Sequence, residues 1–233
     1  MPSYLVQLGA IWIGILAISY PLFLKKIMDE SLGIGREIQE ISDFPYTCRK
    51  IYDPMTEGCE DMWIDYEKRI LYAACASTFS RVHWCPSVTR LNHTAGLGRD
   101  HILMLDLDSP GADGKFGMRE LTFSGYKGPA GATAPDLHGF SVDILDDKTL
   151  RFILVNHKRP TDESGSLLLD AEEVGANSTV EFFNIARGLG ATSLEWKRTV
   201  YDPAIYTPNR VASMGNGDFY VTNDKYAKGK WSS

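Results

Sequence analysis

The stretch LHGFSVDILDDKTLRFILVNH, residues 137–157, decides the fold that we predict for this chain. Its first half alternates between apolar and polar residues from Phe140 to Ile144, whereas residues 150–155 form a continuous apolar run. The polar residues 146–149 lie between the two halves. Two strand-like runs joined by a short polar loop predict a β-hairpin.

The two histidines of this stretch are expected to face each other across the hairpin. If the turn is centred between Asp147 and Lys148, His138 and His157 are equally distant from it. Directly opposed residues share a face of the sheet, with Cβ atoms about 4.5–5.5 Å apart. One imidazole would then take a proton while the other orients or relays it. The alternative is two ordinary polar residues at strand ends, because a register shift of one residue separates the pair.

The composition is that of a globular protein with enough apolar material for one core. The 233 residues are 44% hydrophobic and 23% charged, and 21 glycines accompany 11% aromatic residues, which suits strands and turns. A net charge of −6 argues against a nucleic-acid partner. The sequence contains no dinucleotide-binding fingerprint, P-loop or HExxH motif, so those three classes of site are not predicted.

The N-terminal residues 1–28 are predicted to form a signal-anchor or transmembrane helix. Residues 5–24 are uncharged, mostly apolar and long enough to span a bilayer. A cleaved signal peptide usually has a shorter apolar core and a small-residue cleavage site. A buried core helix is the alternative. A juxtamembrane segment, residues 29–57, is expected to follow, with a short helix over 36–41.

The side of the membrane on which the body lies is predicted from two opposing signals. Lys25 and Lys26 follow the apolar run, which by the positive-inside rule leaves the body in the cytosol. Glycosylation sequons at Asn92 and Asn177 favour the lumen or the cell exterior instead. Together with the family resemblance described below, they predict a membrane-anchored protein on the lumenal or extracellular side.

The four cysteines lie in one early segment, between residues 48 and 85, and none forms a CxxC pair. A zinc site is therefore not predicted. One or two disulfides in an oxidising compartment fit this pattern, and cytosolic free thiols are the alternative.

Residues 58–233 are predicted to be all-β, with a coarse repeat. Three segments begin with polar residues, enter a short strand and return; they start at Glu60, His138 and Asn209, 78 and 71 residues apart. Radially repeated sheets of this kind form a β-propeller whose inner strands start at a central channel. We therefore expect these three residues to gather around one axis. A β-sandwich is the alternative that periodicity leaves open.

Several short motifs occur in an order that is similar to a known family. They are GCED at 58–61, ILMLDLDSPG at 102–111, LHGFS at 137–141, LVNH at 154–157, STVEFF at 178–183, TPNRVASMG at 207–215 and FYVTND at 219–224. With the hydrophobic N-terminus, they make nearly the whole chain resemble the serum paraoxonase/arylesterase family. That family has six-bladed β-propellers with two calcium ions, which hydrolyse lactones and aryl esters. The resemblance implies a calcium-dependent hydrolase of a small lactone or ester substrate.

The resemblance also implies calcium ligands. Glu60 and Asn209 match ligands of the family's catalytic calcium, which polarises the ester oxygen. Asp61 matches a ligand of the structural calcium, and the carbonyl of Phe140 would be another.

The remaining correspondences concern catalysis and a disulfide. His138 and His157 match a histidine dyad that is proposed to activate water, and Asp224 matches an acidic residue near it. Cys48 stands where the family has a cysteine that ties the first segment to the last strand.

Two departures from the family pattern define the alternative function. The chain holds about three blades' worth of sequence, as expected for a truncated N-terminal portion, so later calcium ligands and the partner of Cys48 are missing. Arg210 stands where the family places a calcium-binding carboxylate, and a guanidinium cannot be a ligand. We expect Arg210 to form a salt bridge with Asp61 instead. The alternative to an enzyme is a non-catalytic, membrane-tethered propeller fragment that binds a partner.

Overall fold

The computed structural model describes residues 3–94 and 99–225, which divide into two compact units. In the first unit, residues 1–50, α1 (Tyr4–Ser19) continues into π-helical turns at Tyr20–Leu24 and Ile27–Ser31. Residues 4–24 form a helix that is long and apolar enough to cross a membrane, so the predicted N-terminal apolar helix is confirmed. The helix expected over 36–41 is wrong, because this part of the chain has one 3-10 turn, Ile41–Asp43.

The second unit begins at Ile51, within the segment that the sequence assigned to the juxtamembrane region. Residues 51–57 belong to the β unit because they are bonded to it. Lys115 forms an ion pair with Asp53, with 2.6 Å between Nζ and Oδ2, and the His101 ring lies 2.9 Å from the Met55 carbonyl oxygen.

The second unit contains two four-stranded antiparallel meanders. The first is β1 (Cys59–Asp65), β2 (Ile70–Cys75), β5 (His101–Asp106) and β6 (Arg119–Ser124). The second is β7 (Leu137–Asp146), β8 (Thr149–Asn156), β9 (Thr179–Ala186) and β10 (Ser193–Val200).

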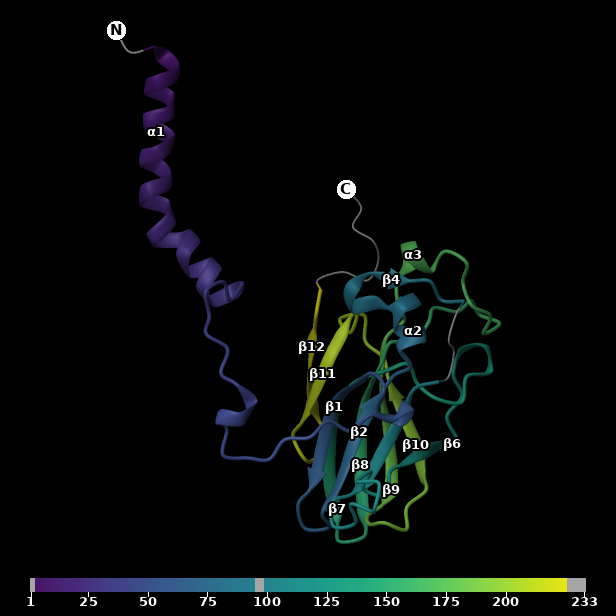
Figure 1. The fold of residues 1–233 in the computed structure, drawn as a ribbon. Coiled ribbons are helices and arrows are strands. Elements are labelled where there is room, and N and C mark those ends of the chain that lie inside the picture. The colour runs from purple at the N-terminus through teal and green to yellow at the C-terminus, as the bar shows by residue number, and fades with distance from the viewer. Residues whose placement is uncertain (1–2, 95–98, 226–233) are drawn as a thin grey trace. The chain divides into compact units, whose positions relative to one another are not determined.

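The two meanders join into one eight-stranded sheet in the order β1-β2-β5-β6-β10-β9-β8-β7 (Figure 1). The joint is a short parallel pairing of β6 with β10. Because β1 and β7, at the two ends of this order, also contact each other, the sheet is barrel-like and nearly closed. A mostly β fold with an N-terminal helix is thus confirmed.

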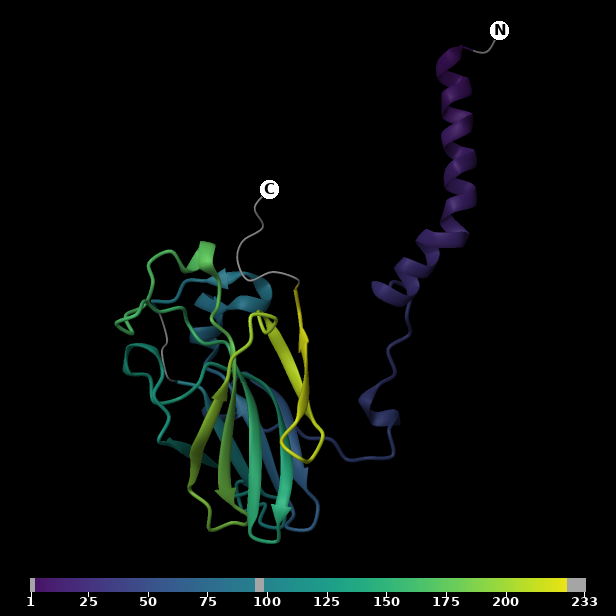
Figure 2. The ribbon, with the colours of Figure 1, turned by 180° about the vertical axis from the view of Figure 1, so that it is seen from behind.

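The second unit also contains smaller elements outside the eight-stranded sheet. A hairpin of β11 (Pro208–Ser213) and β12 (Phe219–Asn223) packs beside β7, as Figure 2 shows. The remaining elements are α2 (Thr78–His83), β3 (Trp84–Cys85), β4 (Arg90–Leu91), α3 (Ala171–Val174) and 3-10 turns at Pro54–Thr56, Pro86–Val88 and Pro129–Gly131.

The main core lies between the two meanders, and Phe152 of β8 is at its centre. The Phe152 ring stacks on Phe140 with 5.7 Å between centroids and meets Tyr72 edge-on at 5.3 Å. The opposite face of β8 presents Ile153 and Val155 to a second core under β11 and β12. A strand that is buried on both faces has no polar face, which explains the continuous apolar run at 150–155.

The register of the β7–β8 hairpin differs from the prediction. Asp146 opposes Thr149 beside the turn, as expected, but two β-bulges then shift the pairing, so that Val142 opposes Phe152 and Leu137 opposes Asn156. A bulge inserts one extra residue on one strand. Both insertions lie on β7 and act in the same direction, so the pairing at the open end of the hairpin is displaced by two residues from the register that a count from the turn predicts.

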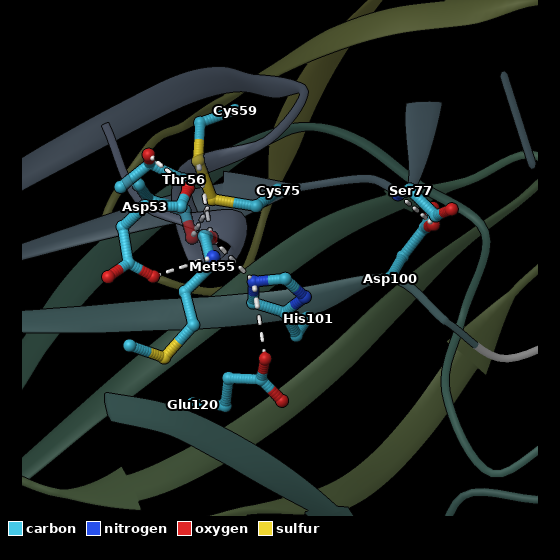
Figure 3. The surroundings of a disulfide bond; sticks show 10 residues. Asp53, Met55, Thr56, Cys59, Cys75, Ser77, Asp100, His101 and Glu120 are labelled. Atoms are coloured by element: carbon cyan, nitrogen blue, oxygen red, sulfur yellow. Dashed lines mark hydrogen bonds and ion pairs between the residues drawn. A yellow bond between two sulfur atoms is a disulfide. The ribbon is translucent and has the colours of Figure 1, made fainter. Parts of the chain in front are cut away.

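One disulfide joins neighbouring strands of the first meander. Cys59 of β1 and Cys75 of β2 are bonded, and Figure 3 shows them beside the Met55 carbonyl and His101. Cys48 and Cys85 are free thiols in the described residues. The disulfide suggested for Cys48 is therefore wrong for this chain. The bond that forms instead follows from direct pairing of Cys59 with Cys75 across the ladder.

Candidate active site

The candidate site lies at the end of the barrel where β7 begins and β8 ends. His138 is the second residue of β7, and His157 is the first residue after β8. The α2 helix and the β3–β4 turn lie at this same end (Figure 1). Tertiary bonds fix His157 on both sides of its Cα, because its N–H donates to the Asp136 carbonyl at 2.8 Å and its carbonyl accepts from Trp84 Nε1 at 2.7 Å.

The two imidazole rings meet, as expected. Their centroids lie 4.8 Å apart with an interplanar angle of 48°. Both side chains are withdrawn from solvent, with 5% of His138 and 1% of His157 exposed. Because Leu137 opposes Asn156, the two histidines are not directly opposed as we predicted, and their rings meet as offset neighbours at the open end of the hairpin.

Two carboxylates flank His138. Glu60 Oε2 lies 2.6 Å from Nδ1, and Asp224 Oδ2 lies 3.8 Å from Nε2. The Glu60 contact has the distance of an ion pair but not the alignment of a hydrogen bond, so the attraction between the two groups is electrostatic. His138, with a smaller contribution from Arg81, holds the pKa of Glu60 below its usual range.

Asn209 reaches the same site through close packing of β11 on β7. A Cβ added to Gly139 would lie 2.5 Å from the Asn209 carbonyl oxygen and 3.0 Å from the Arg210 Cα, so this approach requires glycine. The Asn209 amide Nδ2 donates to Asp224 Oδ1 at 2.6 Å. Glu60, His138 and Asn209, the three starting residues of the sequence repeat, therefore gather in one place.

Burial keeps His157 uncharged. Desolvation, and then the nearby His138 and Arg81, lower the pKa of His157 well below 6.5. Among the described residues, its Nδ1 has no hydrogen-bond partner, and its Nε2 lies 3.5 Å from Ser87 Oγ. At neutral pH this imidazole is therefore a proton acceptor.

The lowered pKa of His157 predicts acid sensitivity. Below pH 6.5 the unfolded state binds a proton that the folded state rejects, so this residue makes stability fall as the pH falls. Between pH 6.5 and 5.5 the loss is about 1 kcal/mol. Urea denaturation at both pH values is expected to show that His157→Gln removes this loss, whereas His83→Gln, at a half-exposed position, keeps it. An equal loss in wild type and His157→Gln would contradict a neutral buried His157.

Asp61 does not fit a calcium ion in this fold, because donors occupy both of its carboxylate oxygens. Oδ2 accepts the N–H of Phe140 at 3.0 Å, and Oδ1 accepts the N–H of Met62 at 2.9 Å. Arg210 Nη2 lies 3.1 Å from Oδ1, so the predicted salt bridge is confirmed. Phe140 thus offers Asp61 its N–H, in contrast to the carbonyl ligand that the resemblance implies.

The catalytic-calcium residues also fit such an ion poorly. Glu60, Asn209 and Asp224 offer three oxygen-bearing side chains, whereas calcium prefers about six to eight oxygens. Glu60 and Asp224 already face His138, and the Arg81 guanidinium lies 3.4 Å from Glu60 Oε2. Within residues 3–94 and 99–225, no group of three or more His, Cys, Asp or Glu side chains is arranged to hold a metal. The residues present therefore do not fit a calcium ion.

Replacing Arg210 with aspartate is expected to create a calcium response that the wild-type protein lacks. The substitution removes a cation from Asp61 and adds a second carboxylate, and paired carboxylates favour a bound cation. Thermal unfolding with calcium and with EDTA measures this response. Arg210→Ala is the control, and its stability loss is about 0.2–1 kcal/mol because the Arg210 side chain is 61% exposed. Equal calcium responses in all three proteins would contradict the idea that Arg210 stands in for an ion.

Two residues of the site have no recognisable signal in the sequence. Arg81 of α2 donates to the Leu137 carbonyl and lies beside Glu60, and Ser87 reaches His157 from the β3–β4 turn. Both come from the connection between β2 and β5. Neither residue belongs to a spaced motif, so their proximity to the histidines follows from the tertiary fold alone.

Comparisons with known proteins leave the family open. No protein-family model matches the chain, and no curated protein matches it. The resemblance therefore enters below as part of a proposal.

Proposed function

We propose that this protein hydrolyses lactones and aryl esters. The observation that carries the proposal is the buried pair of imidazoles, His138 and His157, with Glu60 and Asp224 on either side of His138. Paired histidines with a flanking carboxylate are suited to general-base activation of water. The motif order shared with the paraoxonase/arylesterase family supports the same substrate class.

The geometry supports distinct roles for the two imidazoles. The Glu60 carboxylate favours a proton on Nδ1 of His138, which leaves Nε2 of that ring to accept the proton of an attacking water. Asp224, 3.8 Å from Nε2, stabilises the imidazolium that forms. His157 stays neutral beneath it and restrains the His138 ring. Hydroxide adds to the carbonyl carbon, the C–O bond breaks, and the leaving oxygen takes the proton from His138.

Substitution of each histidine tests this function. Hydrolysis of phenyl acetate and δ-valerolactone by the full chain in detergent is expected to fall about 10²- to 10⁴-fold in His138→Gln and His157→Gln. His83→Gln is the matched control on α2. Rates within twofold of wild type in both variants would overturn the proposal. A wild-type protein without activity would favour the alternative, a non-catalytic binding fragment.

Adding EDTA to the same assay tests whether hydrolysis depends on calcium. Because the described residues fit the ion poorly, we expect EDTA to change the rate by less than twofold. Loss of activity that added calcium restores would show that Glu60, Asn209 and Asp224 bind an ion together, contrary to that fit.

The proposal includes the propeller architecture that the resemblance implies. Two successive four-stranded antiparallel meanders, followed by the β11–β12 hairpin, are what two blades and the start of a third would contain. The first strands of the three units, β1, β7 and β11, contact one another in sequence, as neighbouring inner strands do.

We also propose that the β unit lies in the lumen or outside the cell, tethered by α1, and that Asn92 carries the glycan. Asn92 is exposed, and Thr94 Oγ1 donates to its side-chain oxygen at 2.8 Å. Asn177 is half-buried, and the hydroxyl of its sequon residue Thr179 is buried against Glu181. An N-glycosidase is expected to shift the mass of the expressed wild type and Asn177→Gln but not Asn92→Gln. An unshifted wild type would contradict the lumenal placement.

A further inference from the structure

A serine hydroxyl approaches the buried histidine that the water mechanism leaves neutral. Ser87 is half-buried in the 3-10 turn Pro86–Val88, and its Oγ lies 3.5 Å from His157 Nε2. A nucleophile and its base commonly stand at the long end of hydrogen-bond distance in the absence of substrate. The contact joins residues 70 positions apart in the chain, so tertiary structure alone brings them together.

The turn that carries Ser87 is held from several sides. Pro86 is buried, and its carbonyl accepts the Thr89 N–H at 3.0 Å. Thr89 has a φ of 62°, a left-handed conformation that a threonine adopts only when its surroundings require it. Lys225 Nζ donates to the Pro86 carbonyl at 3.0 Å and to the Thr89 hydroxyl. These hydrogen bonds fix the backbone positions before and after Ser87.

The base is oriented as firmly as the hydroxyl. The His157 backbone is bonded to Asp136 and to Trp84, and its ring lies against His138. With the proton of the neutral ring on Nδ1, Nε2 accepts from the Ser87 hydroxyl. The His138 ring, held by Glu60 and Asp224, packs against this base with 4.8 Å between centroids and restrains it, while His157 Nδ1 has no hydrogen-bond partner among the described residues.

We propose that Ser87 is a nucleophile that accepts the acyl group of an ester or lactone, with His157 as its general base. Ser87 Oγ forms a bond to the carbonyl carbon while its proton moves to His157 Nε2. The C–O bond to the leaving group then breaks, and the leaving oxygen takes that proton. Water attacks the acyl-serine, its proton passes through His157 to Ser87 Oγ, and the carboxylic acid product leaves. No oxidant, reductant or co-reactant other than water is needed.

The substrate class of this inference rests on the proposed function, but the nucleophile is tested independently of turnover. The full chain in detergent is incubated with an alkyl fluorophosphonate, which phosphonylates activated serines with loss of fluoride. Intact-mass measurement and peptide mapping are expected to show one adduct, at Ser87. The adduct is expected to disappear in Ser87→Ala and to form at least 10-fold more slowly in His157→Gln. Ser109→Ala, at an exposed loop position, is the matched control.

Turnover separates the two proposals. If Ser87 is the nucleophile, Ser87→Ala loses hydrolysis about 10²-fold or more, and wild type shows a burst of phenol release before steady state. An active wild type with no Ser87 adduct, and with Ser87→Ala at full rate, overturns this inference and leaves the water mechanism in place. An adduct on an inactive wild type upholds the nucleophile and refutes the proposed function. If neither an adduct nor turnover is observed, both the nucleophile and the proposed function are refuted. Ser87→Gly is a second variant without the hydroxyl. If it loses hydrolysis but keeps the melting temperature of wild type, misfolding is excluded as the cause of the lost activity.

Discussion

Replacing Arg187 with methionine is expected to lower the free energy of unfolding by about 3–5 kcal/mol, because it leaves the buried carboxylate of Asp65 without its ion-pair partner. Arg187 donates from Nε to Asp65 Oδ2 at 2.6 Å and from Nη2 to Asp65 Oδ1 at 2.8 Å. Only 2% of the Arg187 side chain and 1% of the Asp65 side chain are exposed. Their bidentate pair joins the β1–β2 turn to the β9–β10 turn, at the end of the barrel opposite the histidines (Figure 1).

Urea denaturation measures this loss, and a double substitution separates its causes. Asp65→Leu with Arg187→Met replaces the pair by apolar groups of similar size, and the double variant is expected to recover most of the stability. Glu67→Gln, which removes the exposed second partner of Arg187, is the control and costs under about 1 kcal/mol. A loss below 1 kcal/mol in Arg187→Met would show that the turns are held together by other contacts.

Replacing Phe152 with alanine is expected to destabilise the fold by about 3–5 kcal/mol. The ring is fully buried between Tyr72 of the first meander and Phe140 of the second, so its loss leaves a cavity where the two meanders meet. Phe79→Ala, at a position 54% exposed on α2, is the control and costs far less. Equal losses in the two variants would contradict a core centred on Phe152.

Local sequence patterns predict the strands well because alternation and turn residues act over short distances. The hairpin around residues 137–157 forms as expected, and so does the strand that starts near Asn209 and returns, as β11 and β12. The doubly buried β8 is also visible in the sequence as an apolar run. The expected helix over 36–41 fails because scattered isoleucines in a polar segment have no surface to pack against.

Long-range features of the site are only partly visible in the sequence. The Arg210–Asp61 pair was predicted because a cation replaced a carboxylate in a known pattern, and the pair of histidines was predicted from an idealised register. The approach of Ser87 to His157 depends on how separate segments of the chain pack against each other. No local pattern encodes such contacts, so the sequence alone could not supply them.

The parallel pairing of β6 with β10 has a kinetic consequence. Each antiparallel meander forms from neighbours in the chain, but Thr122 meets Ser193 only after the whole second meander has been made, 71 residues later. Closing so long a loop costs entropy before any contact compensates for it. We expect the two meanders to assemble first and to dock in a slower final step. During that interval β6 presents an unpaired edge, so refolding yield should fall as protein concentration rises.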